Sequence, residues 1–148
     1  MKILIIGNGI AGITAARHIR KNSDFGITVV SSESKYFFSR TALMYVYMGH
    51  MKMEHIQPYE NNFWQKNRID LIQDRVLELN HKNNAVILEN GGELKYDKLI
   101  IATGSKPNFF GWKGQDLIGV QGLYSKQDLE TMEQNTKVLK VRSFLEED

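Results

Sequence analysis

The chain has 148 residues, the size of one ordinary domain, and 42% of them are hydrophobic, which is enough for a real core. Its 19 Lys and Arg residues balance 17 Asp and Glu residues, and no basic run that could follow a phosphate backbone occurs, so nucleic acid is not an expected partner. The absence of cysteine excludes disulfides and thiol chemistry by this chain, and the four histidines lack the clustered spacing of a metal site.

The apolar N-terminus does not resemble a secretory signal. Lys2 precedes the run Ile-Leu-Ile-Ile, but glycines at positions 7, 9 and 12 interrupt the apolar core that such a signal requires. No stretch is long enough to cross a bilayer, so a membrane partner is not expected either. The sequence therefore predicts a cytoplasmic protein.

The first thirty residues predict a β-α-β unit. Residues 1–6 are a short apolar run ended by glycine, which is typical of a buried parallel strand. Residues 10–21 carry apolar side chains at helical spacing, with cations gathered toward their end. Residues 22–26 predict a turn, and the β-branched residues 27–30 predict a second strand, so the unit has about the length expected for dinucleotide binding.

The turn between the first strand and the helix has the pattern Gly-x-Gly-x-x-Gly. Its first glycine permits a tight turn, its second lets the backbone approach a pyrophosphate, and its third lets the helix pack closely on the sheet. A pyrophosphate would bind free N–H groups at the positive end of the helix. Glycine turns also arise for packing alone, so the context has to decide. The candidate cofactor-binding residues here are Gly7, Asn8, Gly9, Ile10, Ala11 and Gly12.

An acidic residue is expected roughly 20 residues past the glycines, where a carboxylate accepts hydrogen bonds from ribose hydroxyls. Glu33 qualifies, although it lies two residues beyond the most usual position, which Ser31 occupies. The alternative is a solvated glutamate in a loop.

Two short helices are expected in the middle of the chain. Ser39 can cap an apolar helix that runs through Met48 and that Gly49 ends. Pro58 can start a second helix through Asn67.

The second half of the chain changes pattern. Residues 75–80, 85–90 and 93–96 predict a small antiparallel meander. Residues 98–104 predict another buried apolar strand that stops at a glycine, and residues 126–133 predict a helix. The expected fold class is α/β, a Rossmann-like domain in which a parallel sheet with a β-α-β start is joined by an antiparallel β-meander.

Three features coincide: the glycine turn, the meander after two helices, and the segment YDKLIIATGSKP at residues 96–107. Together they resemble the FAD-dependent pyridine nucleotide-disulphide oxidoreductase family of two-dinucleotide-fold flavoproteins. The resemblance makes Ala102, Thr103 and Gly104 a second FAD-contacting motif, where a strand delivers small residues beside the cofactor. The alternative for this motif alone is an ordinary strand end.

The segment YFFSRTALMYVYMG at residues 36–49 is similar to the loop and helix of nitrite-reductase-like and ferredoxin-reductase-like family members. This resemblance places Arg40 against the FAD phosphates or the flavin, a role that suits a planar cation. The alternative is a surface arginine. Relatives that reduce peroxide, oxygen or coenzyme A disulfide carry a redox cysteine in this neighbourhood, so those activities are not expected here. Val76 falls where the family uses a backbone contact to adenine, although it could equally be meander core.

The resemblance assigns residues 1–110 to the first part of a discontinuous FAD-binding domain and residues 111–148 to a connector toward a missing NAD(P)H-binding domain. It implies an incomplete fold that binds the ADP moiety of FAD, with NAD(P)H bound only in a complete family member. Hydride transfer needs the donor to be positioned over the flavin, so turnover of NAD(P)H by this chain alone is not expected. No catalytic residue is identified.

Two other functions stay open at this point. The chain could be a fold remnant or interaction module without flavin, or a plain NAD-binding Rossmann protein. An open sheet edge or exposed apolar surface favours a homo-oligomer. In the alternative, residues 138–148 fold back and cap the sheet.

Overall fold

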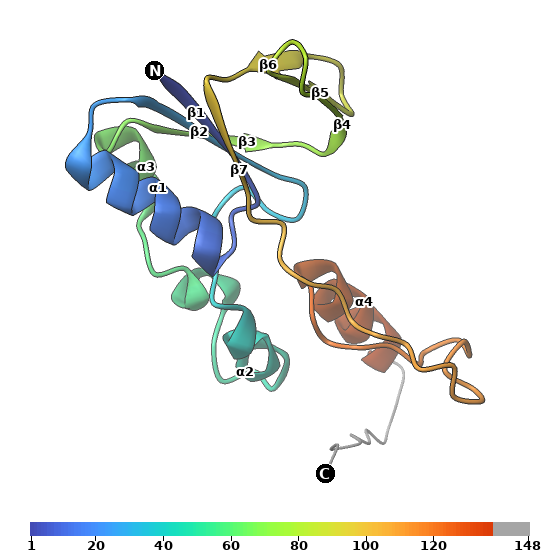
Figure 1. The fold of residues 1–148 in the computed structure, drawn as a ribbon. Helices are drawn as coiled ribbons and strands as arrows, with labels where there is room; N and C mark the ends of the chain where they lie inside the picture. The colour runs from blue at the N-terminus through green and yellow to red at the C-terminus, as the bar shows by residue number, and fades with distance from the viewer. Residues whose placement is uncertain (138–148) are drawn as a thin grey trace.

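The structure is a computed structural model that describes residues 1–137. Its main body has three layers: helices on one face of a parallel sheet and a small antiparallel sheet on the other (Figure 1). The last described helix lies at the opposite end of the molecule from the antiparallel sheet (Figure 1). Within the described part, no helix is both long and apolar enough to cross a membrane.

The parallel sheet contains β1 (Lys2–Ile6), β2 (Gly26–Ser31), β3 (Ile69–Gln73) and β7 (Lys98–Ile101). Their order is β3-β2-β1-β7, and every neighbouring pair is parallel. The chain thus moves outward from β1 to β3 on one side and later returns to place β7 on the other side. This reversal next to β1 is the kind of switch point at which open parallel sheets bind ligands.

Helices α1 (Ile10–Asn22) and α3 (Asn61–Lys66) cover one face of this sheet. The apolar spacing of α1 directs Ile13 and Ala16 into the core, where both are buried. The buried residues of this cluster are Ile3, Ile5, Ile13, Ala16, Ile27, Val29, Phe37, Trp64 and Ile69.

The other face of the parallel sheet packs against β4 (Val76–Asn80), β5 (Ala85–Leu88) and β6 (Glu93–Lys95), which pair in that order and antiparallel. Gly91 and Gly92 both have a positive φ and turn the chain from β5 into β6. The buried residues between the two sheets are Leu4, Val30, Val86 and Leu88.

A third apolar cluster lies below the sheet. It joins the short helices η1 (Arg40–Ala42), α2 (Leu43–Tyr47) and η2 (Met53–Ile56) to α4 (Lys126–Thr136). Its buried residues are Phe38, Leu43, Tyr47, Ile56 and Leu129. The helix expected within the connector therefore packs against the N-terminal part of the chain.

The α/β fold class and the meander expected from the sequence are confirmed. The strand expected over residues 98–104 forms as β7 but ends at Ile101, and it is not buried, because it lies at the edge of the parallel sheet and Ile101 is exposed. Strand β3 was missed because polar Asp70 and Gln73 interrupt its short apolar run. The helix expected over residues 39–48 divides into η1 and α2, and Ser39 makes no side-chain cap there. The helix expected from Pro58 through Asn67 is α3, which begins three residues later, at Asn61, and ends at Lys66. The proposed capping tail, residues 138–148, lies outside the described residues.

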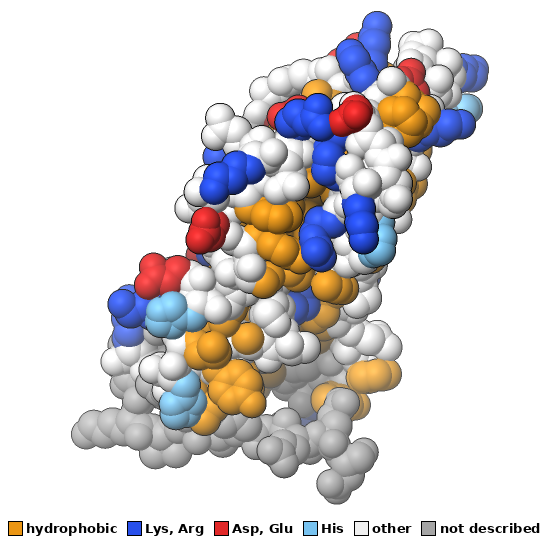
Figure 2. Space-filling view, turned by 90° about the vertical axis from the view of Figure 1, so that its left-hand side faces the viewer, with side chains coloured by type: hydrophobic (Ala, Val, Ile, Leu, Met, Phe, Trp, Pro, Cys, Tyr) orange, Lys and Arg blue, Asp and Glu red, His pale blue; other side chains and the backbone are white. Residues whose placement is uncertain are grey.

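Several large apolar side chains are exposed. On the face shown in Figure 2, hydrophobic side chains lie between Lys and Arg side chains, which gather in the upper part of the view. Part of the connector is also apolar and exposed, but the homo-oligomer expected from such surface stays a prediction. The exposed residues are Trp112, Leu117, Ile118 and Val120 in the connector, together with Phe109 and Phe110 just before it.

Two glycines of the turn after β1 are required by close packing. Gly7 has a φ of +107°, and a Cβ added to it would lie 2.1 Å from the carbonyl oxygen of Ala102. A Cβ on Gly12 would lie 2.0 Å from the carbonyl oxygen of Gly7. Both neighbours are backbone atoms, so a side chain at either position forces the turn or the helix to move.

We predict that Gly12→Ala lowers the free energy of unfolding by about 1–3 kcal/mol, because the added methyl group overlaps the backbone of the turn. Urea denaturation measures this difference. The control is Gly26→Ala, where the nearest atom to an added Cβ is 3.9 Å away. Equal stability of the two variants would contradict the packing role of Gly12.

Candidate functional site

A cavity of about 700 Å³ lies at the carboxyl ends of the parallel strands. Its walls come from the turn after β1, the ends of β2 and β7, residues 37–41, residues 74–76 and residues 124–125 of the connector. Small-molecule sites commonly have volumes of about 300–1,000 Å³, so the cavity has the size of a ligand site. It is lined by the predicted site residues Gly7, Asn8, Gly9, Ile10, Ala11, Glu33, Arg40, Val76, Ala102, Thr103 and Gly104.

The second glycine of the turn faces open space. Gly9 is the N-cap of α1, and a Cβ built on it meets no atom within 4 Å. The first turn of α1 contains no acidic residue, and Ile10 and Ala11 line the cavity. Because the first N–H groups of a helix have no acceptor within the helix, this turn offers donors and a positive dipole end to an anion.

Two predicted site residues, Asn8 and Gly12, have a structural role in the wall of the cavity. Asn8 is buried, and its side-chain amide donates a 2.7 Å hydrogen bond to the carbonyl oxygen of Ser34, which ties the turn to the loop after β2. Gly12 does not line the cavity, and it lets α1 approach the turn. Val76 packs against the cluster between the two sheets, as expected of a meander residue, and it also lines the cavity, while its contact with adenine stays a prediction.

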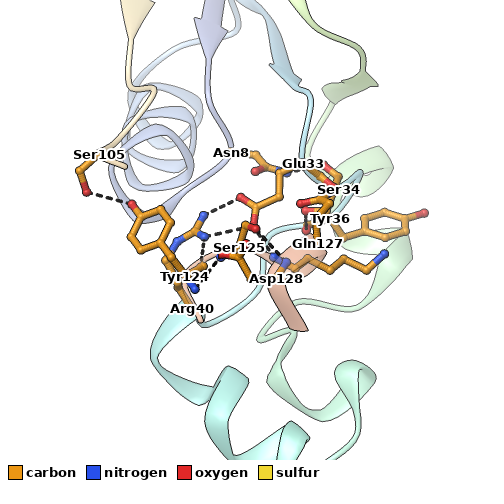
Figure 3. A network of polar contacts seen from close by, with 11 residues as sticks. Asn8, Glu33, Ser34, Tyr36, Arg40, Ser105, Tyr124, Ser125, Gln127 and Asp128 are labelled. Carbon is orange, nitrogen blue, oxygen red and sulfur yellow. Dashed lines mark hydrogen bonds and ion pairs between the residues drawn. The ribbon is translucent and has the colours of Figure 1, made fainter. Parts of the chain in front are cut away.

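An ion pair crosses one side of the cavity (Figure 3). Arg40 donates to the Glu33 carboxylate through both terminal nitrogens, at 3.1 Å and 2.6 Å. Oε1 of Glu33 also accepts a 2.8 Å hydrogen bond from the backbone N–H of Lys126, the first residue of α4. Glu33 is thus neither a solvated loop residue nor an unpaired carboxylate.

Arg40 also contacts the connector. One of its nitrogens donates to the carbonyl oxygen of Tyr124, and its Cζ lies 4.4 Å from the centroid of the Tyr124 ring. Burial alone would lower the pKa of Arg40, but the hydrogen bond and charge of Glu33, with smaller contributions from Tyr124 and Asp128, raise it. The guanidinium therefore stays cationic in the cavity wall.

The cavity-lining residues that sequence reasoning missed include Ser105, Tyr124 and Ser125. The hydroxyl groups of Ser105 and Tyr124 lie 2.9 Å apart, within hydrogen-bond distance. The one local signal was the pair Ser125 and Asp128, whose spacing is that of a capping box. The structure contains this box, with Ser125 accepting from the Asp128 N–H at 3.0 Å.

Asp128 anchors the start of α4. Its Oδ2 accepts hydrogen bonds from the backbone N–H groups of Ser125 at 2.7 Å and Tyr124 at 3.0 Å. Burial raises the pKa of Asp128, but these hydrogen bonds, that of the Ser125 side chain and the charge of Arg40 outweigh burial and lower it. Within residues 1–137, no group of His, Cys, Asp or Glu side chains is arranged to hold a metal ion.

Comparison with known proteins assigns the family. Residues 1–141 match the profile of the family described as pyridine nucleotide-disulphide oxidoreductase. This chain belongs to that family. The resemblance drawn from the glycine turn and the segment at residues 96–107 is therefore confirmed.

The relatives that this chain resembles are longer proteins. An NADH oxidase of Methanocaldococcus jannaschii is 34% identical over 128 residues, which are 81% of this chain and 29% of that protein. The solved NADH:rubredoxin oxidoreductase of Clostridium acetobutylicum is 33% identical with a TM-score of 0.80, covering 92% of this chain and 35% of that one. The sulfide:quinone oxidoreductase of Aquifex aeolicus is 29% identical with a TM-score of 0.76, covering 93% and 32%. The chain thus spans about a third of the length of these relatives.

We predict that Asp128 stabilises the protein in a pH-dependent way. A lowered folded-state pKa gives stability that is present above the unfolded value, about pH 3.8, and that is lost as the pH falls through the folded value. The difference in unfolding free energy between the parent and Asp128→Asn should be full at pH 6 and should shrink below pH ~4.

Urea denaturation at several pH values measures this difference. Asp116→Asn, at an exposed connector position, is the control for the loss of one carboxylate. A difference for Asp128→Asn that stays constant from pH 6 to pH ~3 would contradict the role of the ionised carboxylate.

Proposed function

We propose that this chain is the FAD-binding part of an FAD-dependent NAD(P)H oxidoreductase and that it binds the ADP moiety of FAD. The observation that carries the proposal is the environment of Gly9. Of the three glycines in the turn, Gly7 and Gly12 are closed in by backbone, whereas Gly9 opens onto the cavity at the start of α1. A pyrophosphate needs this arrangement of open space, free N–H donors and a positive helix end.

The residues present fit the rest of the ADP moiety. Glu33 lies two residues after the end of β2 and lines the cavity, close to the position where a carboxylate accepts hydrogen bonds from a ribose. A carboxylate has about four acceptor positions, and the three N–H groups that reach Glu33 leave one for a ribose hydroxyl. Val76 offers an apolar wall and a backbone edge to the adenine.

The small residues Ala102, Thr103 and Gly104 at the end of β7 leave room for the continuation of the cofactor beyond the pyrophosphate. Bound FAD would supply the two-electron chemistry that a hydride donor such as NAD(P)H requires. The contribution of the described residues is to bind and orient FAD. NAD(P)H as the electron donor is supported by the names of the relatives, an NADH oxidase and an NADH-rubredoxin oxidoreductase.

We predict that Gly9→Val abolishes FAD binding while the fold is kept. The branched side chain would occupy the space over the turn, and losing two charge-assisted hydrogen bonds costs about 3 kcal/mol or more, which is at least about 100-fold in affinity. Because no atom lies within 4 Å of the added Cβ, the unfolding transition should stay close to that of the parent.

Titration of the purified protein with FAD, ADP and NAD, followed by flavin absorbance and by calorimetry, tests the proposal. Binding of FAD and ADP by the parent, but not by Gly9→Val, is the expected result. A parent that binds NAD more tightly than FAD would indicate a plain NAD-binding protein. Binding of none of the three would indicate a fold without a nucleotide.

We predict that Glu33→Gln weakens FAD binding by about tenfold or more, since a hydrogen bond to a charged group contributes about 1.5–3 kcal/mol. The substitution keeps the size of the side chain and removes its charge. Riboflavin, which lacks the ADP moiety, serves as the control ligand, and its binding should not change. An unchanged dissociation constant for FAD would remove Glu33 from the ribose site.

A further inference from the structure

We propose that Tyr124, in the connector, is the positioning residue that holds Arg40 in place for the pyrophosphate. The proposal rests on the proposed function, because it assigns a partner to a guanidinium that faces the FAD cavity. Sequence analysis placed residues from 111 onward outside the cofactor-binding part. The structure places Tyr124 in the wall of the cavity, 84 residues along the chain from Arg40.

Two kinds of contact join Tyr124 to Arg40 (Figure 3). The carbonyl oxygen of Tyr124 accepts a hydrogen bond from Nη1, and its ring lies beside the guanidinium with the Cζ 4.4 Å from the ring centroid. Phe38 contributes a second ring at 5.6 Å. A cation that lies over an aromatic face gains electrostatic energy and loses freedom of orientation.

The ring of Tyr124 is itself held in place. Its hydroxyl lies 2.9 Å from that of Ser105, which follows the small residues at the end of β7. Asp128 accepts from the N–H of Tyr124 and fixes the backbone at the start of α4. The orientation of Arg40 therefore depends on β7 and on α4, as well as on its own loop.

Arg40 keeps donors available for a ligand. Its contacts within the described residues use three of the five N–H donors of the guanidinium, two on Glu33 and one on the carbonyl of Tyr124. The planar group can thus remain paired and still donate to an oxygen of the pyrophosphate. Tyr124 fixes the orientation of the guanidinium plane and therefore the directions in which these remaining donors point.

The test is a double-mutant cycle on the complete chain, with Tyr124→Leu, Arg40→Gln and the combined variant. Tyr124→Leu removes the ring and keeps an apolar side chain and the backbone carbonyl. It should weaken binding of FAD and of ADP by roughly threefold to thirtyfold, the range of a cation–π contact. In the Arg40→Gln background, the same substitution should change the dissociation constant less than about twofold.

Two controls separate positioning from folding. Tyr45→Leu changes an exposed tyrosine on α2 that does not line the cavity, and it should leave the affinity for FAD unchanged. Adenosine lacks the pyrophosphate, so its binding should not respond to Tyr124→Leu. Thermal denaturation of each variant reports any loss of fold.

A readout that needs no ligand is the ¹⁵N spectrum of the Arg40 guanidinium. A held group gives separate Nη signals in the parent, and these should average in Tyr124→Leu. Averaged signals in the parent, or equal losses of affinity in both backgrounds of the cycle, would overturn the positioning role. A parent that binds neither FAD nor ADP would instead overturn the proposed function, and the ¹⁵N spectrum would still decide whether Tyr124 orients Arg40.

Discussion

The structure depends on one place where no side chain fits, the point at which the end of β1 meets α1 and β7. A Cβ on Gly7 would overlap the carbonyl of Ala102, and a Cβ on Gly12 would overlap the carbonyl of Gly7. Hydrogen bonds from Gly7 to Val30 and from Ala102 to Ile6 hold three strand ends together at the same point. The start of α1 is thereby fixed at the mouth of the cavity, so the geometry that closes the fold also presents the N–H groups that can bind an anion.

The pair formed by Glu33 and Arg40 has a different physical character. Its side chains are 19% and 32% exposed, so the pair is largely buried and the cost of desolvating two charges offsets much of their attraction. Its importance is geometric, because the bidentate contact fixes two groups of opposite charge on one wall. The charge of the cavity wall is nearly balanced, so under the proposed function attraction for a phosphate would come from the end of α1 and from the free donors of Arg40 rather than from net positive charge.

Local patterns predicted much of the fold. The β-α-β unit, the meander and β7 each follow from runs of apolar or β-branched residues ended by glycine or polar turns. Strand β3 was not predicted, because the polar residues Asp70 and Gln73 leave it with few consecutive apolar residues. Its parallel pairing with β2 makes it a strand despite this polar pattern. The residues of the glycine turn and Glu33 could be proposed from the sequence because such turns and carboxylates keep a regular spacing in dinucleotide-binding proteins, and the structure brings all of them except Gly12 to one cavity.

The contacts of the connector could not be found in this way. Tyr124 reaches Arg40 across 84 positions, and nothing in the neighbouring sequence distinguishes a ring that stacks on a guanidinium from one that packs in a core. The family resemblance places the start of the connector at residue 111, whereas burial follows a different division. Leu129 is 2% exposed and packs with Phe38 and Leu43, so α4 completes an apolar cluster that begins in the loop before α2. Because Lys126 at the start of that helix donates to Glu33, the packing of α4 and the arrangement of the cavity wall are parts of one structure.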